Sequence, residues 1–434
     1  MELTIEKLVY GGEGLGRTPE GEVIFVPYSA PQDILSVERV RGSAKPAKAT
    51  ISSIVTPSGE RVEPACSVFE ECGGCQWQHL SITAQRSWKH DIVLESLNRI
   101  GKMPDVAVLP TLSVDDDGWK SRNRVQWEIE PAGDELAGNP IHKLGYYQAQ
   151  SHDIVEFDHC HVIPDALNQV ALRMRQLIRE NASLASGLLR IEAFISPAPE
   201  EEILLTLSGE KNQALKPLAE QLMQEFPTIQ GVCYLDSGNK DATPRPLAGD
   251  SALEFSLAGN QYRVSAGHFF QTSYAGAETL LNILEKALPE SIDSLLDVYA
   301  GVGLFSIHFA KRTQRVLAIE SSPSTEADAH ENFSMNEIIN VAWKTGDARQ
   351  SLRALNEKFE VAIVDPPRGG CQPEVLNWLS QHIEKQLVYV SCNPTTLARD
   401  LKLLVAQGWK IDMVQPVDMF PHTYHVETVV SLSR

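Results

Sequence analysis

Apolar and polar positions change their pattern at about Ser265. Beyond this point, short apolar runs alternate with segments of helical spacing. Uninterrupted runs of this kind are typical of parallel strands that are buried on both faces. The alternation predicts a doubly wound α/β sheet, with strands at Leu295–Tyr299, Arg315–Glu320, Val361–Asp365 and Leu387–Ser391.

The last two apolar runs, Lys410–Phe420 and His425–Leu432, are separated only by a short Pro-His-Thr-Tyr segment. A link of this length allows a hairpin, whereas a parallel crossover needs a dozen residues or more. We therefore predict that an antiparallel hairpin completes the sheet.

The first 56 residues have the pattern of short strands separated by turns rich in glycine and proline. This pattern predicts a small β-barrel. Its expected strands are Leu3–Tyr10, Gly21–Val26 and Ile34–Val40.

The region between the barrel and the sheet has mixed α+β character. The whole chain has 434 residues, a length that allows about three domains. We place these domains at residues 1–56, 57–264 and 265–434. Expected helices are Ile82–Ile100 and Ala166–Glu180, and expected strands are Arg124–Glu130, Ile203–Ser208 and Gly231–Leu235.

Composition limits the class of protein. Hydrophobic residues make up 43% of the chain, enough for a sizeable core. The net charge of −19 is evidence against a generic nucleic-acid binder, so any RNA must be bound through local basic patches. Four basic residues between Arg39 and Lys48 form one such stretch, which by itself reads as a solvated loop.

The beginning of the chain does not have the pattern of a secretory signal. Its apolar stretches are also too short to cross a bilayer. We expect a cytoplasmic protein, and a monomer.

Acidic residues mark the ends of several predicted strands. Asp297 lies in a strand that leads into a glycine-rich turn at Gly301 and Gly303. In open α/β sheets, ligands bind outside the carboxyl ends of the strands, and an acid after the second strand can accept hydrogen bonds from ribose hydroxyls. The pattern resembles class I S-adenosylmethionine methyltransferases. The acids that end the second, third and fourth strands are Glu320, Asp347 and Asp365.

Cys392 follows the fifth strand in Ser-Cys-Asn-Pro, and Glu427 begins the last strand. Taken alone, each residue could have a purely structural role: Cys392 could be a buried thiol, and Glu427 could be an exposed acid at the start of a strand. If the last strand is antiparallel, however, both side chains lie at the cofactor edge and can face one pocket.

A thiolate and a carboxylate beside a methyl donor suit methylation of uracil carbon 5. Addition of the thiolate at carbon 6 makes carbon 5 nucleophilic, and a base then removes the carbon 5 proton. The target base must leave its stack to react.

Four motifs strongly resemble the bacterial RNA uracil-C5 methyltransferases: Ser-Cys-Asn-Pro, Asp-Met-Phe-Pro-His-Thr-Tyr-His-Val-Glu, Phe-Phe-Gln and Asp-Pro-Pro-Arg. The resemblance implies that Cys392 is the nucleophile and Glu427 the base, with Phe269 in the base pocket. It implies S-adenosyl-L-methionine as the cofactor, contacted by Gln271, Tyr299, Glu320, Asp347 and Asp365. Leu304 departs from the family, which often has Asn there, and this puts one cofactor hydrogen bond in doubt.

Seven cysteines include a cluster at Cys66, Cys72 and Cys75. The spacing suits zinc or an iron–sulfur cluster, with Cys160 as the natural fourth ligand. His159 and His161 could also bind zinc, so ligand chemistry alone leaves zinc as an alternative. The resemblance implies a 4Fe-4S cluster held by the four cysteines, with a structural or RNA-contacting role.

The N-terminal segment resembles the TRAM domain, an OB-like barrel that binds RNA. Ser121-Arg122-Asn123-Arg124 also resembles a family segment that faces the RNA, which makes Arg122 a candidate substrate contact. A TRAM domain combined with a cluster implies 23S ribosomal RNA as the substrate, with transfer RNA as the alternative.

Two other functions are consistent with parts of the sequence. An RNA cytosine-C5 methyltransferase would have a second cysteine directly after the Asp-x-Pro motif, where this chain has Arg368. A non-catalytic iron–sulfur protein that binds RNA would leave Cys392 and Glu427 without a role.

Overall fold

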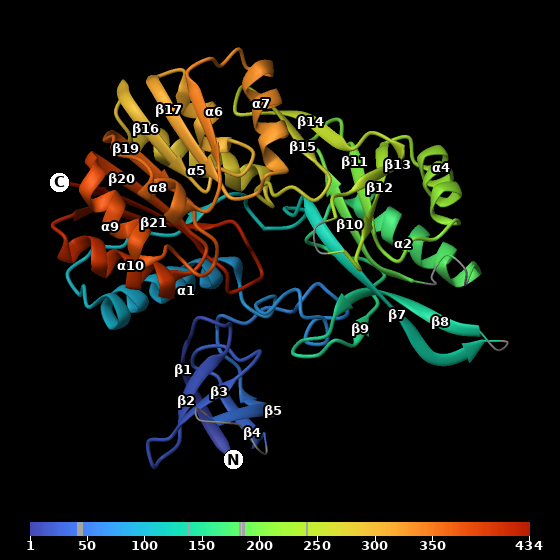
Figure 1. The fold of residues 1–434 in the computed structure, drawn as a ribbon. Helices are drawn as coiled ribbons and strands as arrows, with labels where there is room; N and C mark the ends of the chain where they lie inside the picture. The colour runs from blue at the N-terminus through green and yellow to red at the C-terminus, as the bar shows by residue number, and fades with distance from the viewer. Residues whose placement is uncertain (41–46, 137–138, 182–183, 185–186, 240–241) are drawn as a thin grey trace.

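The computed structural model describes residues 1–40, 47–136, 139–181, 184, 187–239 and 242–434. Figure 1 shows three lobes: a small barrel, a central sheet and a larger sheet covered by helices. No helix in the described ranges is long and apolar enough to cross a membrane.

The first lobe is the predicted closed barrel, with strand order β1-β2-β3-β5-β4. Alternate residues such as Leu3 and Ile5 point into its core. Part of the basic stretch after Arg39 lies outside the described residues, and its two ends form ion pairs, Arg39 with Glu22 (2.5 Å) and Lys48 with Glu13 (2.6 Å). The strands are β1 (Glu2–Leu8), β2 (Gly14–Arg17), β3 (Val23–Val26), β4 (Ile34–Arg39) and β5 (Ala47–Thr56).

Helix α1 (Ile82–Ser96) follows the barrel and continues into the π-helical turn η1 (Leu97–Gly101). The Ser81 hydroxyl caps its start by accepting a hydrogen bond from the Ala84 N–H. Although α1 comes early in the chain, it packs against the last lobe, where Val93 and Leu97 belong to the core. The short strand β6 (Leu112–Ser113) also joins the sheet of that lobe.

The central lobe is a seven-stranded sheet of order β13-β12-β11-β10-β7-β8-β9. Helices α2 (Asp165–Glu180) and α4 (Leu215–Glu225) pack on it through leucines such as Leu167 and Leu218. The strands are β7 (Arg124–Leu136), β8 (Asn139–Tyr147), β9 (Ile154–Val155), β10 (Leu188–Ile195), β11 (Ile203–Gly209), β12 (Ile229–Asp236) and β13 (Arg245–Gly249).

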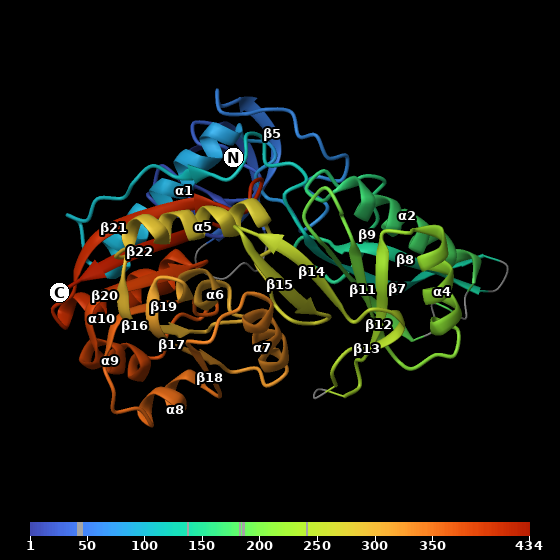
Figure 2. The same ribbon diagram turned by 90° about the horizontal axis from the view of Figure 1, so that it is seen from above.

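A hairpin of β14 (Ala252–Leu257) and β15 (Asn260–Ser265) lies between the two large sheets (Figure 2). Its Phe255 and Tyr262 belong to the core of the last lobe, and so does Phe194 of β10. This shared core joins the central sheet to the last lobe.

The last lobe is the predicted doubly wound sheet, with order β18-β17-β16-β19-β20-β22-β21-β6. Strands β16 to β20 are parallel, and β22 runs antiparallel to both β20 and β21, which confirms the predicted hairpin. The strands are β16 (Ile292–Val298), β17 (Thr313–Glu320), β18 (Val341–Thr345), β19 (Phe359–Val364), β20 (Ile383–Ser391), β21 (Lys410–Asp418) and β22 (Glu427–Ser433).

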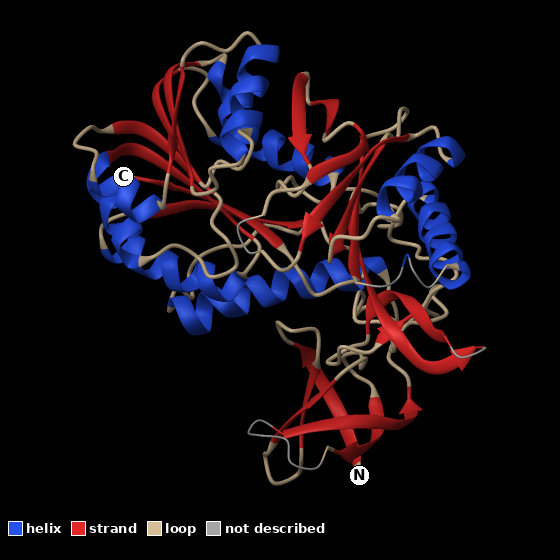
Figure 3. Cartoon of the chain, turned by 45° about the vertical axis from the view of Figure 1, so that its right-hand side comes forward, coloured by secondary structure: helices blue, strands red, loops and turns tan. Residues whose placement is uncertain are grey.

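Helices cover both faces of this sheet, as the cartoon in Figure 3 shows. Alternate residues of β19 face two different cores, Val361 and Ile363 on one side and Ala362 and Val364 on the other. Burial on both faces explains why this strand reads as an uninterrupted apolar run. The helices are α5 (Tyr274–Ala287), α6 (Leu304–Ala310), α7 (Thr325–Met335), α8 (Ala348–Arg353), α9 (Pro373–His382) and α10 (Pro394–Ala406).

Candidate active site

A cleft of about 960 Å³ opens at the carboxyl ends of the parallel strands. It lies where ligands bind in open α/β sheets. All nine residues that the sequence suggested for catalysis, cofactor or substrate line this one cleft: Arg122, Phe269, Gln271, Tyr299, Glu320, Asp347, Asp365, Cys392 and Glu427.

The glycine-rich turn after β16 brings its backbone to the cleft. Tyr299, Gly301 and Gly303 have φ angles of 70°, 57° and 95°, in the left-handed region that favours glycine. The buried Asp297 carboxylate holds the following helix by accepting hydrogen bonds from the Ser306 N–H (3.0 Å) and hydroxyl (2.6 Å). Asp297 therefore fixes the position of α6 relative to β16, and with it the turn that joins them.

Two carboxylates stand beside this turn. Glu320 accepts hydrogen bonds from the backbone N–H of Gly301 (3.0 Å) and of Ser322 (2.9 Å), which fixes it at the end of β17. Asp347 caps α8 by accepting from the Gln350 N–H at 3.1 Å. Leu304, in contrast, is buried in the core beneath the cleft.

Gln271 and Asp365 are linked directly, since the Gln271 amide donates to the Asp365 carboxylate at 3.1 Å. The Asn123 side chain, next to Arg122, donates to the Gln271 carbonyl at 2.9 Å and so ties the central lobe to the cleft. Phe269 is 60% exposed at the cleft. A large apolar side chain left this open is available to stack on a base.

Cys392 directly follows β20, and Glu427 begins the neighbouring strand β22. Ser391 of β20 pairs with Thr428 of β22, so the next residue along each strand toward the cleft is Cys392 or Glu427. The Asn393 side chain caps α10 and turns the chain sharply after the cysteine. Glu427 is 4% exposed, and its Oε1 has no hydrogen-bond partner among the described residues.

Burial dominates the electrostatics of these groups. It raises the pKa of Cys392 to about 11, with the Glu427 and Asp365 carboxylates adding to the effect and Arg368 opposing it. Burial likewise raises the pKa of Asp365 to about 7 and that of Glu427 well above its ordinary value. At neutral pH the Cys392 thiol therefore holds its proton and needs local positive charge to lose it.

Several residues at the cleft were missed by the sequence reasoning. Arg368 closes the Asp-Pro-Pro-Arg motif, and its carbonyl accepts a hydrogen bond from the Asn393 side chain at 3.0 Å. Phe420, Tyr424 and His425 lie inside the motif that ends at Glu427. Their place in these motifs was a usable signal, and so was the position of Arg349, which lines the cleft two residues after Asp347.

The four cysteines Cys66, Cys72, Cys75 and Cys160 line a second cavity, of about 220 Å³. Burial raises the pKa of Cys72 to about 11 and that of Cys75 to about 12. In the described part of the chain, no group of three or more His, Cys, Asp or Glu side chains is placed to hold a metal ion, and this applies to the expected 4Fe-4S cluster as well as to zinc. Arg122 lines this cavity as well as the cleft, and its guanidinium lies 5.0 Å from the Phe420 ring centre.

Comparison with known proteins gives consistent matches along the whole chain. The model of the family described as tRNA (Uracil-5-)-methyltransferase matches residues 138–434, and that of the TRAM domain matches residues 1–51. An uncharacterized RNA methyltransferase of Gloeobacter violaceus is 33% identical over 99% of this chain and 95% of its own length. One from Halalkalibacterium halodurans is 31% identical over 100% of this chain and 96% of its own length.

A solved structure is similar along its full length. It is the tRNA (uracil-54, C5)-methyltransferase of Pyrococcus abyssi in complex with S-adenosyl-L-homocysteine, with a TM-score of 0.76 and 26% identity, covering 100% of this chain and 99% of that one. The chain therefore belongs to the tRNA (uracil-5-)-methyltransferase family of RNA methyltransferases and begins with a TRAM domain.

Proposed function

We propose that the protein transfers a methyl group from S-adenosyl-L-methionine to carbon 5 of a uridine in RNA. The observation that carries this proposal is the pair Cys392 and Glu427, which line one cleft directly after β20 and at the start of its neighbour β22. A nucleophile and a base so close suit a reaction that adds at carbon 6 and removes a proton from carbon 5.

The residues at the carboxyl edge fit the cofactor. Glu320 and Asp347 would accept hydrogen bonds from hydroxyl and amino groups, and the Gln271–Asp365 pair would face the reacting end. Tyr299, at the start of the glycine-rich turn, lines the same cleft. When bound, the cofactor supplies an electrophilic methyl group on a sulfonium.

The chain's own residues account for the remaining steps. The Cys392 thiol loses its proton to water, and the thiolate forms a bond to carbon 6, which moves electron density to carbon 5. With the cofactor bound, carbon 5 would form its bond to the methyl group as the methyl–sulfur bond breaks, and the electron pair of that bond would stay on the sulfur of S-adenosyl-L-homocysteine. The Glu427 carboxylate takes the carbon 5 proton, the electron pair of that C–H bond restores the double bond, and the thiolate leaves. The raised pKa of Glu427 makes its carboxylate a stronger base for this step.

We propose 23S ribosomal RNA as the substrate and transfer RNA as the alternative. The TRAM match at residues 1–51 and the cysteine cavity support the ribosomal substrate, because the resemblance of a TRAM domain combined with a cluster implies 23S ribosomal RNA. The printed names of the family model and of the Pyrococcus abyssi enzyme support transfer RNA. Arg122 and Phe269 would contact the RNA beside the target base.

We also propose that the cysteine cavity holds a 4Fe-4S cluster bound by Cys66, Cys72, Cys75 and Cys160. Two points support this proposal: four cysteine thiols line one cavity, and polynuclear iron clusters are held by cysteine thiolates. The cysteine cavity has a volume of about 220 Å³. This is far above the roughly 15 Å³ that a single water molecule needs. Methyl transfer needs no electron, so the cluster's role is structural or in RNA contact.

The test is a methylation assay with radiolabelled S-adenosyl-L-methionine on unmodified 23S rRNA and on tRNA, followed by identification of the nucleoside. We expect 5-methyluridine in 23S rRNA. Cys392→Ala should abolish methylation but still bind S-adenosyl-L-homocysteine. Glu427→Gln should stall after methyl transfer and accumulate a protein–RNA adduct that survives denaturation, because proton removal precedes release of the thiolate.

Each outcome has a distinct meaning. Label in tRNA alone would keep the reaction and reverse the choice of substrate. Methylation by Cys392→Ala would show that the covalent mechanism is wrong. No label in either RNA from protein with bound cofactor would favour the non-catalytic RNA-binding alternative.

A further inference from the structure

The turn between β21 and β22, residues 419–426, forms a wall shared by two cavities. Phe420, Tyr424 and His425 line the catalytic cleft, whereas Pro421 and Thr423 line the cysteine cavity. Glu427 follows this turn directly, so whatever fixes the turn also fixes the carboxyl group.

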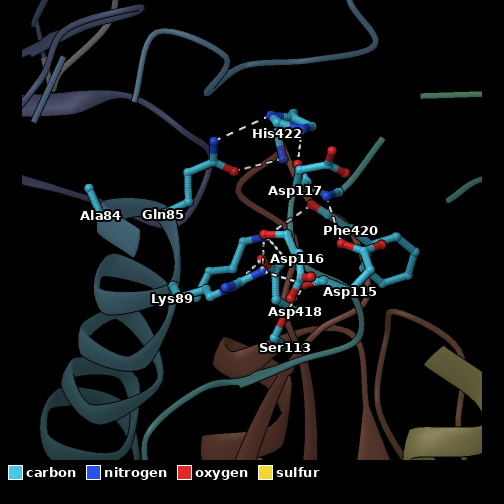
Figure 4. Close-up of polar contacts among 12 residues, drawn as sticks. Ala84, Gln85, Lys89, Ser113, Asp115, Asp116, Asp117, Asp418, Phe420 and His422 are labelled. Carbon is cyan, nitrogen blue, oxygen red and sulfur yellow. Dashed lines mark hydrogen bonds and ion pairs between the residues drawn. The ribbon is translucent and has the colours of Figure 1, made fainter. Parts of the chain in front are cut away.

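Lys89 of α1 holds one end of the turn. Its side chain is fully buried, forms an ion pair with Asp418 and donates to the Phe420 carbonyl at 2.9 Å (Figure 4). Asp418 ends β21, and the residue before it, Val417, pairs with Glu427 across the hairpin. Lys89 therefore anchors the strand end that lies opposite Glu427.

Gln85, one helical turn earlier, holds the middle of the turn. Its amide oxygen accepts the His422 N–H at 2.7 Å, and its amide nitrogen donates to the Trp77 and Leu80 carbonyls, each at 3.0 Å. The His422 carbonyl in turn accepts the N–H groups of Gln76 (3.0 Å) and Trp77 (2.9 Å). Both backbone polar groups of His422 are thus held by α1 and the segment before it.

His422 itself has a strained backbone and a fully engaged ring. Its φ is 64°, which is uncommon for a residue other than glycine. The ring stacks on Trp119 at 3.7 Å between centres, and its Nε2 lies 3.0 Å from the Asp117 carbonyl. Burial lowers its pKa to about 4, so the ring is neutral and Nε2 carries the proton that it donates. Strain of this kind persists only where the surroundings over-determine it, and it is characteristic of functional sites.

Burying the Lys89–Asp418 pair removes two charges from water, which costs desolvation free energy. Well-packed apolar residues often stabilise a core as much as a buried ion pair does, so such a pair is better explained by the geometry that it imposes. We propose that Lys89, Asp418, Gln85 and His422 are positioning residues that aim Glu427 at the reacting base. This inference rests on the proposed role of Glu427 as the base.

The test compares Gln85→Leu and the double variant Lys89→Met/Asp418→Asn with Glu427→Gln and the wild type. The double variant removes both buried charges together, and Arg86, which lies 3.7 Å from the Asp418 carboxylate, keeps its hydrogen bonds to the Asp115 and Asp116 carbonyls. A displaced base slows proton removal, so turnover on uridine-containing RNA should fall about 10- to 100-fold. The denaturation-stable protein–RNA adduct should accumulate as it does with Glu427→Gln, because the thiolate and the methyl transfer are untouched.

Gln415→Leu is the matched control. Gln415 is also a buried glutamine, lies on β21 three residues before Asp418, and donates to the Pro110 carbonyl at 2.8 Å instead of to the turn. It should keep wild-type turnover without accumulating adduct. S-adenosyl-L-homocysteine affinity and melting temperature are measured for every variant.

The outcomes separate the two proposals. If Glu427→Gln does not accumulate adduct, the role of Glu427 is wrong and the positioning role falls with it. If Glu427→Gln stalls but the network variants turn over like the wild type, the positioning role alone is overturned. It is also overturned if they lose adduct formation, cofactor binding and melting temperature together, since that marks a general structural defect.

Discussion

Single residues at the cleft face opposing electrostatic demands. Cys392 must be a thiolate to react, yet burial and the carboxylates of Glu427 and Asp365 hold its proton on. Arg368 is the neighbouring cation that opposes them, and the hydrogen bond from Asn393 to its carbonyl fixes its backbone beside the nucleophile. Arg368 is therefore the candidate for activating the thiol, although the sequence indicated it only as the last residue of Asp-Pro-Pro-Arg and as the position where a cytosine-C5 enzyme would have a cysteine.

We predict that Arg368→Gln raises the pKa of the Cys392 thiol further above about 11. Only the thiolate is alkylated, so at pH 9 the rate with iodoacetamide should fall about 3-fold or more and recover at higher pH. Mass spectrometry of the Cys392 peptide measures the rate. Arg349→Gln, at another cleft arginine, is the control and should react like the wild type. Equal rates for the two variants would contradict an activating role for Arg368.

At the scale of elements, the turn between β16 and α6 combines two glycines with different surroundings. A Cβ added at Gly301 meets nothing within 4 Å, and Gly301 lines the cleft. A Cβ added at Gly303 lies 3.3 Å from both Ile307 and Phe333 in the core. The first glycine leaves room for a ligand, and the second leaves room for packing.

We predict opposite profiles for the two alanine variants. Gly301→Ala should lower the free energy of unfolding by about 1 kcal/mol through its positive φ, and should weaken S-adenosyl-L-homocysteine binding about 10-fold by placing a methyl group in the cleft. Gly303→Ala should lower the free energy of unfolding more and the affinity less. Urea denaturation and titration calorimetry measure both. The ligand role of Gly301 is wrong if the two variants lose affinity equally.

Local pattern was sufficient for most elements of the last sheet. The apolar runs predicted β16, β17, β19 and β20, and the short link predicted the antiparallel hairpin, because these signals are local. The pattern did not predict that β6 joins this sheet or that α1 packs against the core of the lobe. An apolar face indicates that a segment is buried, but it does not indicate which other segment packs against that face.

The candidate site likewise contains some contacts that the sequence could indicate and others that it could not. Cys392 and Glu427 could be brought together from the strand order, since the residues beside them pair between β20 and β22. The contact of Lys89 with Asp418 spans 329 residues, and although Asp418 opens the motif that ends at Glu427, Lys89 belongs to no motif. No spacing in the chain could indicate it.

At the scale of the whole molecule, the cysteine cavity lies where separate parts of the chain meet. Cys66, Cys72 and Cys75 precede α1, whereas Cys160 lies before α2 in the central lobe. Cys160 is fixed by Asn168, whose side chain accepts its N–H at 2.8 Å and donates to its carbonyl at 3.0 Å. A cluster bound there would fasten the linker after the barrel to the central sheet.

We predict that Cys160→Ala, purified without oxygen, loses most of its iron and acid-labile sulfide and melts at a lower temperature. Three thiolates leave a cluster without its fourth ligand. Cys233→Ala is the control, because Cys233 is buried in the central sheet away from the cavity, and it should keep its iron. Iron and sulfide analysis with thermal melting measures both. Full iron content in Cys160→Ala would refute the assigned ligand set.

The Lys89–Asp418 contact has a consequence for how the enzyme is made. A ribosome adds about 5 to 20 residues per second, so Lys89 emerges about 15 to 65 s before its partner 329 residues later. Throughout that interval the ammonium group remains hydrated, and α1 has no hairpin to pack against. The site that modifies RNA is therefore assembled near the end of synthesis, and a nascent chain that has not reached Asp418 cannot yet form it.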